Sequence, residues 1–115
     1  MIKVVGGNVK IVRGDTGVLE LTIEDAEHQS YDFSNDTVVL TVKKNAWDKD
    51  PVIQKTFDEN GKVVFEVEDT KDLAFADFVF DVQLTHTETI DDEDVVTVDT
   101  VIPMHKFTVL PEVTW

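Results

Sequence analysis

Alternation of apolar and polar residues with a period of two is the strongest constraint on the fold of this chain. Leu19, Leu21 and Ile23 alternate with polar neighbours, which gives a strand one apolar face and one polar face. Further strand-like segments follow along the chain, at 37–43, 53–57, 62–67, 78–85, 95–98 and 107–110. Many short strands at this spacing predict an all-β sandwich or barrel.

Polar segments rich in turn residues separate these strands. Asn60-Gly61 accepts positive φ at low cost, and this dipeptide predicts a hairpin between Phe57 and Val63. The segment 86–94 is acidic and is expected to form a long loop. Two shorter polar loops are expected at 25–30 and 47–51.

One short segment favours a helical turn. Residues 68–73 offer Asp69 or Thr70 as an N-cap, but the segment is too short for a helix that is stable alone. We expect a single turn that crosses between two sheets, with Leu73 or Phe75 closing the end of the core.

The tripeptide Arg13-Gly14-Asp15 precedes the first alternating segment. Such a tripeptide is the integrin-binding motif, and it also occurs often by chance. Glycine and aspartate favour turns, so we interpret the tripeptide as a turn that leads into the strand from Val18.

Composition limits the class of protein. The chain has 115 residues, of which 42% are hydrophobic, and a formal net charge of −14, which is consistent with one acidic globular domain spanning 1–115. Nucleic acid is excluded as a partner because a phosphate backbone is bound through clustered Lys and Arg. No apolar run is long enough to cross a membrane, and the first residues lack the apolar core of a signal peptide, so we expect synthesis in the cytoplasm. The chain has no cysteine, which excludes disulfides and thiolate metal sites.

Residues that carry catalysis are scarce, and none is assigned a catalytic role. No histidine has a partner at a recognised metal-ligand spacing, although a zinc site that combines all three is an open alternative. Neither serine lies in a Gly-x-Ser-x-Gly motif. Paired carboxylates of a small hydrolase are a remote alternative, since a chain this acidic supplies such pairs by chance. The residues concerned are His28, His86, His105, Ser30 and Ser34.

The densest run of carboxylates is the segment 91–94. Calcium prefers oxygen ligands, so Asp91, Asp92 and Asp94 are candidate calcium ligands, with Asp48 and Asp50 as a weaker pair. A calcium- or carbohydrate-binding module of a bacterium is therefore the alternative to a purely structural module. The competing interpretation is a solvated loop, and no cofactor is assigned.

Four residues are candidates for contact with a partner protein. The segment 52–57, between Pro51 and the Asn-Gly turn, is expected to be an edge strand suited to strand addition. Tryptophan is frequent at binding hot spots, although Trp47 could instead pack on the end of the core and Trp115 could be frayed. The four candidates are Trp47, Val52, Gln54 and Trp115.

The order of several framework motifs resembles a known family. The segments 13–16, 69–73, 78–84 and 107–111 read Arg-Gly-Asp-Thr, Asp-Thr-Lys-Asp-Leu, Phe-Val-Phe-Asp-Val-Gln-Leu and Phe-Thr-Val-Leu-Pro. This order resembles the small immunoglobulin-like domain of phage tail and baseplate proteins. It is similar to the N-terminal domain of the upper baseplate protein family of phages of Gram-positive bacteria. The resemblance covers nearly the whole chain, from about Arg13 onward.

The resemblance implies both a fold and a role. The fold would be an immunoglobulin-like antiparallel β-sandwich of about seven to nine strands with one short helical turn. The role would be that of a non-enzymatic virion component of a phage or prophage tail, made in the host bacterial cytoplasm, which docks onto other tail or baseplate proteins. Association with further copies of itself is a second expectation. The chain departs from the family at 76–78 and 104–106, where a glycine is usual.

Overall fold

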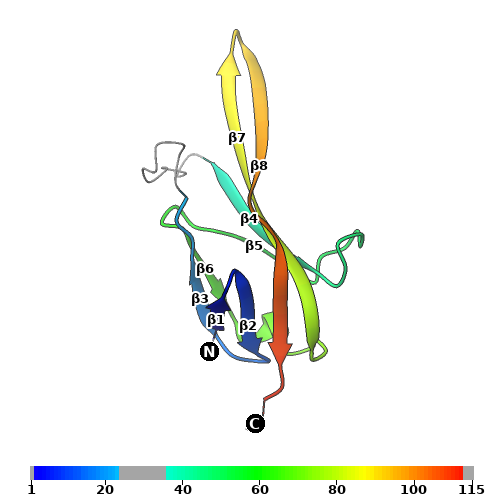
Figure 1. The fold of residues 1–115 in the computed structure, drawn as a ribbon. Helices are drawn as coiled ribbons and strands as arrows, with labels where there is room; N and C mark the ends of the chain where they lie inside the picture. The colour runs from blue at the N-terminus through cyan, green and yellow to red at the C-terminus, as the bar shows by residue number, and fades with distance from the viewer. Residues whose placement is uncertain (1, 24–35, 113–115) are drawn as a thin grey trace.

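The computed structural model describes residues 2–23 and 36–112, and it is built almost entirely of strands. The elements are β1 (Ile2–Val5), β2 (Asn8–Val12), β3 (Gly17–Glu20), β4 (Thr37–Lys43), β5 (Ile53–Thr56), β6 (Lys62–Phe65), α1 (Val67–Thr70), β7 (Ala76–Ile90) and β8 (Glu93–Leu110). Six strands form one curled sheet in the order β1-β2-β8-β7-β4-β5, and β3 pairs with β6 in a second sheet (Figure 1). The all-β, sandwich-like fold is thereby confirmed. Within the described residues, no helix is long and apolar enough to cross a membrane.

Among the described strands, all neighbouring pairs are antiparallel except one. β2 runs parallel to β8, with Val9 opposite Phe107 and Val12 opposite Leu110. The large sheet is therefore mixed rather than purely antiparallel. This parallel pair joins the N-terminal hairpin to the last strand, so segments from the two ends of the chain share one sheet (Figure 1).

The core lies between the two sheets, and the alternation in sequence predicts most of it. Phe65 of β6 and Phe107 of β8 are both fully buried, and their ring centroids lie 5.7 Å apart, so they join the two sheets directly. Leu19, Leu21 and Ile23 are partly buried against the same cluster. The buried residues of the large sheet are Val9, Ile11, Val38, Leu40, Val42, Ile53, Phe78, Phe80, Val82, Leu84, Phe107 and Val109.

The hairpin β1–β2 was not foreseen. Its turn is Gly6-Gly7, with φ of 58° and 84°, and two successive residues with positive φ favour glycine. A Cβ atom on Gly7 would lie 2.6 Å from Nε2 of His105, so this glycine also allows a close approach to β8. A Gly-Gly pair between two apolar runs was the available signal.

The predicted turn at Asn60-Gly61 is present, but the predicted hairpin is wrong. Asp58 Oδ1 accepts hydrogen bonds from the backbone N–H groups of Asn60 and Lys62, each at 2.9 Å, and Gly61 has a φ of 77°. However, β5 pairs with β4 and β6 pairs with β3. The turn therefore sends the chain from one sheet to the other.

The expectation of a long acidic loop at 86–94 is also wrong. β7 continues to Ile90, β8 begins at Glu93, and Asp91-Asp92 is a two-residue turn with φ of 52° and 66°. The last residue of β7 that pairs with β4 is Thr85, opposite Thr37. Beyond it, β7 and β8 form a two-stranded hairpin that projects from the body (Figure 1). Residues 85–98 are called the arm below.

The helical turn begins one residue and ends three residues earlier than expected. Its N-cap is Glu66, whose backbone N–H donates to Asp69 Oδ2 at 2.6 Å, so the expected cap at Asp69 or Thr70 is wrong. Thr70 is instead fully buried, and its Oγ1 accepts a hydrogen bond of 2.8 Å from Gly14 N–H. The turn at Gly14 is confirmed by its φ of 82°. Of the two residues expected to close the core, Leu73 packs against it, whereas Phe75 is exposed.

Candidate protein-binding surface

The strand β5 lies at one end of the six-stranded sheet, as expected for an edge strand. Phe57 N–H donates to Val38 O at 2.9 Å. Because hydrogen-bonding direction alternates along an antiparallel strand, the backbone groups of Ile53 and Lys55 also face β4. Those of Gln54 and Thr56 therefore point away from the sheet. They offer an N–H and C=O row to which another strand could pair.

Trp47 is the most exposed of the large hydrophobic side chains in the described part of the chain, with 80% of its surface accessible. It lies in the loop between β4 and β5, within a turn closed by a hydrogen bond of 3.1 Å from Asp48 N–H to Asn45 O. The alternative that Trp47 packs on the core is therefore wrong. Val52 and Gln54 are also exposed, and Trp115 lies outside the described residues.

A shallow open pocket adjoins this edge on the solvent side of the large sheet, which we call the outer face. Its volume is about 410 Å³. Gln54 Nε2 donates to Thr41 Oγ1 at 3.2 Å across its floor. The pocket contains one carboxylate, Asp81, so it does not offer the pair that glycoside hydrolysis requires. Its lining residues are Thr41, Lys43, Ala46, Lys49, Pro51, Gln54, Val79, Phe80, Asp81, Gln83 and Met104.

Two lysines line this pocket and a third lies next to it on β8, and the sequence did not reveal them as a group. Val79 of β7 lies between Lys43 of β4 and Lys106 of β8 in the pairing register, and paired residues project on the same side of a sheet. Lys49 lines the pocket from the loop. None of the three forms an ion pair with another described residue. This lysine face (Lys43, Lys49 and Lys106) therefore brings three positive charges together on a chain with a net charge of −14, with Asp77 and Asp81 of β7 on the same side of the sheet.

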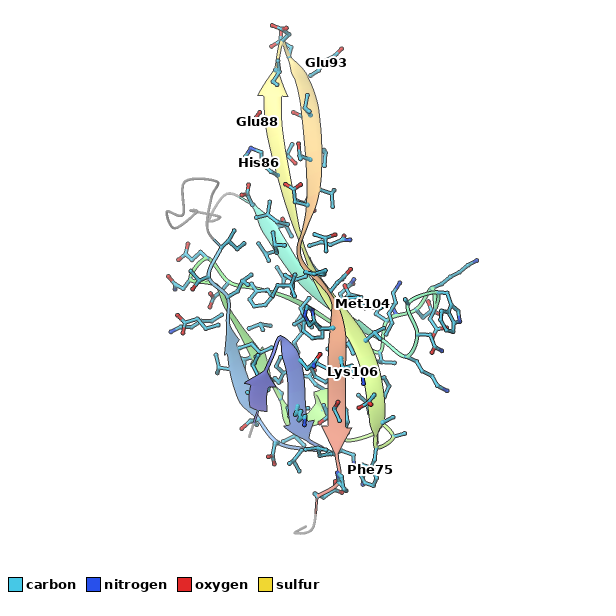
Figure 2. The ribbon with its side chains drawn as sticks, in the orientation of Figure 1. Phe75, His86, Glu88, Glu93, Met104 and Lys106 are labelled. Carbon is cyan, nitrogen blue, oxygen red and sulfur yellow. The ribbon has the colours of Figure 1, made fainter. Side chains whose placement is uncertain are left out.

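A cluster of one histidine and two carboxylates, His86, Asp36 and Glu88, lies at the base of the arm (Figure 2). His86 Nδ1 contacts Asp36 Oδ1, and its Nε2 lies 3.2 Å from Glu88 Oε1. Hydrogen bonding to Asp36 and then to Glu88 raises the pKa of His86 above its ordinary value, against a smaller opposing effect of burial. Asp36, whose side chain is 2% exposed, is 50 residues away in sequence, so the sequence pattern gave no signal for this contact.

The candidate calcium ligands do not converge. Asp91 and Asp92 form the turn of the arm, and Asp94 Oδ1 accepts a hydrogen bond of 3.0 Å from the Thr89 hydroxyl. In residues 2–23 and 36–112, no group of three or more His, Cys, Asp or Glu side chains is placed to hold a metal ion. The weaker candidate pair, Asp48 and Asp50, is likewise not part of such a group.

The histidines do not form a common site among the described residues either. His105 is partly buried, with its ring 6.3 Å from that of Phe80 and its Nδ1 at 2.6 Å from Pro103 O. His86 is instead held by carboxylates on the arm. His28, Ser30 and Ser34 lie outside the described residues.

Comparison with family models, curated proteins and solved structures finds no match to this chain. The edge strand, the exposed tryptophan and the lysine face are thus the features from which a function can be inferred.

Proposed function

We propose that this chain is a non-enzymatic binding module of a phage or prophage tail, which docks onto another tail or baseplate protein through β5 and Trp47. The observation that carries the proposal is the position of Trp47. Its side chain is 80% exposed in the loop that leads into the unpaired edge of β5. A large exposed aromatic side chain next to an open strand edge combines an anchor with a hydrogen-bonding template.

The two parts of this surface supply different contributions. Backbone hydrogen bonds from Gln54 and Thr56 would set the register of an added strand, whatever its sequence. Burial of Trp47 would supply most of the affinity, since aromatic side chains remove a large apolar area from water on binding. The pocket beside β5 has room for one or two side chains of the partner strand.

The assignment to a phage tail rests on the resemblance of the framework motifs to immunoglobulin-like domains of tail and baseplate proteins. It implies a location in the virion after synthesis in the host cytoplasm. The absence of a carboxylate pair in the pocket supports a binding role over the hydrolase alternative.

The test is co-expression of the chain with each tail and baseplate protein encoded beside it, followed by a light-scattering mass of the purified complex. We expect a complex of defined stoichiometry with one of them. Trp47→Ala should weaken binding at least tenfold, because hot-spot truncations cost about 2 kcal/mol or more. Gln54→Pro should weaken it too, since proline removes the outward N–H while leaving the bonds to β4 intact.

Val64→Ala is the matched control. Val64 is an exposed apolar residue, 52% accessible, on the two-stranded sheet away from β5, and its truncation should leave affinity unchanged. Binding that survives both Trp47→Ala and Gln54→Pro would reject this surface. A chain that binds none of the neighbouring tail proteins would reject the proposed function itself.

A further inference from the structure

The outer face of the sheet continues along β7 into one side of the arm, although the pairing of β7 with β8 shifts register between Phe80 and Gln83. Along β7, the buried residues up to Leu84 alternate with Val79, Asp81 and Gln83 on the outer face. The same alternation places Thr85 and Thr87 on that side of the ribbon. The pairing register adds Val98 opposite Thr85 and Val96 opposite Thr87. One surface therefore runs from the lysine face to the tip of the arm.

The two ends of this surface differ in charge. The arm has five carboxylates and no Lys or Arg. Glu88 lies beside His86 nearer the base, and the other four gather at the tip: Asp91, Asp92, Glu93 and Asp94. Between the tip and the body, the outer side of the arm is uncharged and exposes Val96 and Val98, 59% and 55% accessible. At the body end, Lys43, Lys49 and Lys106 have no ion-pair partner among the described residues. They outnumber the two carboxylates of β7 on the same face, Asp77 and Asp81.

The arm also lacks support of its own. From Thr87 to Thr100 every residue is exposed, and an isolated two-stranded hairpin is marginally stable in water. A partner that covers the outer side would bury the β-branched residues there. The partner needs positive charge for the tip, and the lysine face is such a surface on this chain itself.

We propose that the chain forms a two-fold symmetric dimer in which the arm of each copy lies on the lysine face of the other. Val79 and Asp91 are equally distant in sequence from Thr85, by 85 − 79 and 91 − 85 residues. A two-fold axis near Thr85 therefore places the acidic tip of one arm over Val79 of the second copy, between its Lys43 and Lys106. Parallel stacking of two arms would instead bring the acidic tips together.

The area required also favours reciprocal exchange. One side of a two-stranded ribbon six residue pairs long covers roughly 20 Å by 10 Å, or about 200 Å². A stable interface buries about 800 Å² on each partner. In a reciprocal dimer each copy buries one side of its own arm and the outer face under the other arm, about 400 Å² in all, which is twice what a single arm provides and half the standard area, as for a weak dimer that salt dissociates. The dimer does not depend on the proposed function.

The test uses charge reversal and the mass in solution. The wild-type chain should be dimeric by sedimentation at about 50 µM in low salt, and dissociate as salt screens the contacts. Asp92→Lys/Glu93→Lys/Asp94→Lys should be monomeric, and so should Lys43→Glu/Lys106→Glu. An equimolar mixture of the two variants should be dimeric, because in a reciprocal heterodimer each arm meets a face of opposite charge.

Lys62→Glu/Lys71→Glu is the control, because it changes the net charge as much as Lys43→Glu/Lys106→Glu at two exposed lysines elsewhere. It should remain dimeric. A monomeric wild-type chain in low salt would overturn the proposal, and so would a mixture that stays monomeric. A dimer that both reversals leave intact would show that copies associate through another surface. A dimer with no binding to tail proteins would leave this inference standing and reject only the proposed function.

Discussion

Arg13 and Glu112 lie 99 residues apart in sequence and form a two-point ion pair. Nε of Arg13 donates to Oε2 at 3.0 Å and Nη2 donates to Oε1 at 2.7 Å. The guanidinium carbon also lies 4.1 Å from the centroid of Phe75, and Nη1 donates to Leu73 O at 3.4 Å. One side chain thus ties the turn after β2 to the segments before β7 and after β8.

Arg13→Lys should lower the urea midpoint of unfolding, because an ammonium group cannot form the two parallel hydrogen bonds of a guanidinium. Lys62→Arg, at an exposed position on β6, is the control and should have no effect. Equal urea midpoints for wild type and Arg13→Lys would show that the two-point hydrogen bonding does not contribute to stability.

The contribution of the Arg13–Glu112 ion pair to stability should decrease in acid. The hydrogen bonds from Arg13 hold the pKa of Glu112 below its ordinary value of 4.5. Because the pKa of Glu112 is lower in the folded state, its carboxylate contributes to the free energy of unfolding above pH 4.5. This contribution is lost as pH falls through the folded-state pKa. The difference in urea midpoint between wild type and Glu112→Gln should therefore shrink below pH 4.5. A difference that is constant down to pH 2 would contradict this.

His86 should make stability depend on pH in the opposite direction. Its pKa is raised above 6.5, first by Asp36 and then by Glu88. The contribution of protonated His86 to the free energy of unfolding is therefore fully present below pH 6.5. It is lost as pH rises through the folded-state pKa of His86. The urea midpoint of wild type minus that of His86→Gln should decline as pH is raised from 5.5 to 9. A difference that does not change over this range would show that the cluster is not coupled to folding.

Thr70 provides a test of a single buried hydrogen bond. Its Oγ1 accepts from Gly14 N–H at 2.8 Å in a fully buried position. Thr70→Val keeps the shape but leaves that N–H without its partner, which should cost about 1–3 kcal/mol in free energy of unfolding. Thr70→Ser retains the hydroxyl and should cost less. If the two variants lose equal stability, packing rather than the hydrogen bond determines the effect.

The sequence was sufficient to predict the parts of the fold that depend on local alternation. Val38, Leu40 and Val42 are buried because they share one side of β4, as their spacing indicates. The edge position of β5 also followed from a local signal, the preceding Pro51. Strand partners did not follow, because Asn60-Gly61 specifies a turn whether the flanking strands pair or separate into two sheets.

The candidate sites were harder to predict because they depend on long-range pairing. Lys43 and Lys106 become neighbours through Val79 only in the register of β4, β7 and β8. His86 meets Asp36 for the same reason. The segment 95–98 of the arm followed from the sequence as a strand, but 86–94 did not, because carboxylates disfavour strands, although Thr85, Thr87 and Thr89 alternate at strand spacing. That spacing was the overlooked signal.

The turn of the arm is strained, and relieving the strain should stabilise the arm. Asp91 and Asp92 both have positive φ, which costs most L-residues about 1 kcal/mol each. The pair Asn-Gly is preferred in such two-residue turns. Asp91→Asn/Asp92→Gly should therefore stabilise the arm by about 1 kcal/mol, which corresponds to roughly fivefold slower amide exchange.

Amide hydrogen exchange over residues 86–97 is the measurement, in about 0.5 M salt so that contacts between charged surfaces are screened. Asp91→Val is the opposing variant, because a β-branched side chain tolerates positive φ poorly, and it should speed exchange in the arm. Amides of Val38 and Leu40 in the core should be unaffected in both variants, since the arm has no buried contact with them. Faster exchange in Asp91→Asn/Asp92→Gly would mean that the two aspartates hold the arm together by contacts other than their backbone geometry.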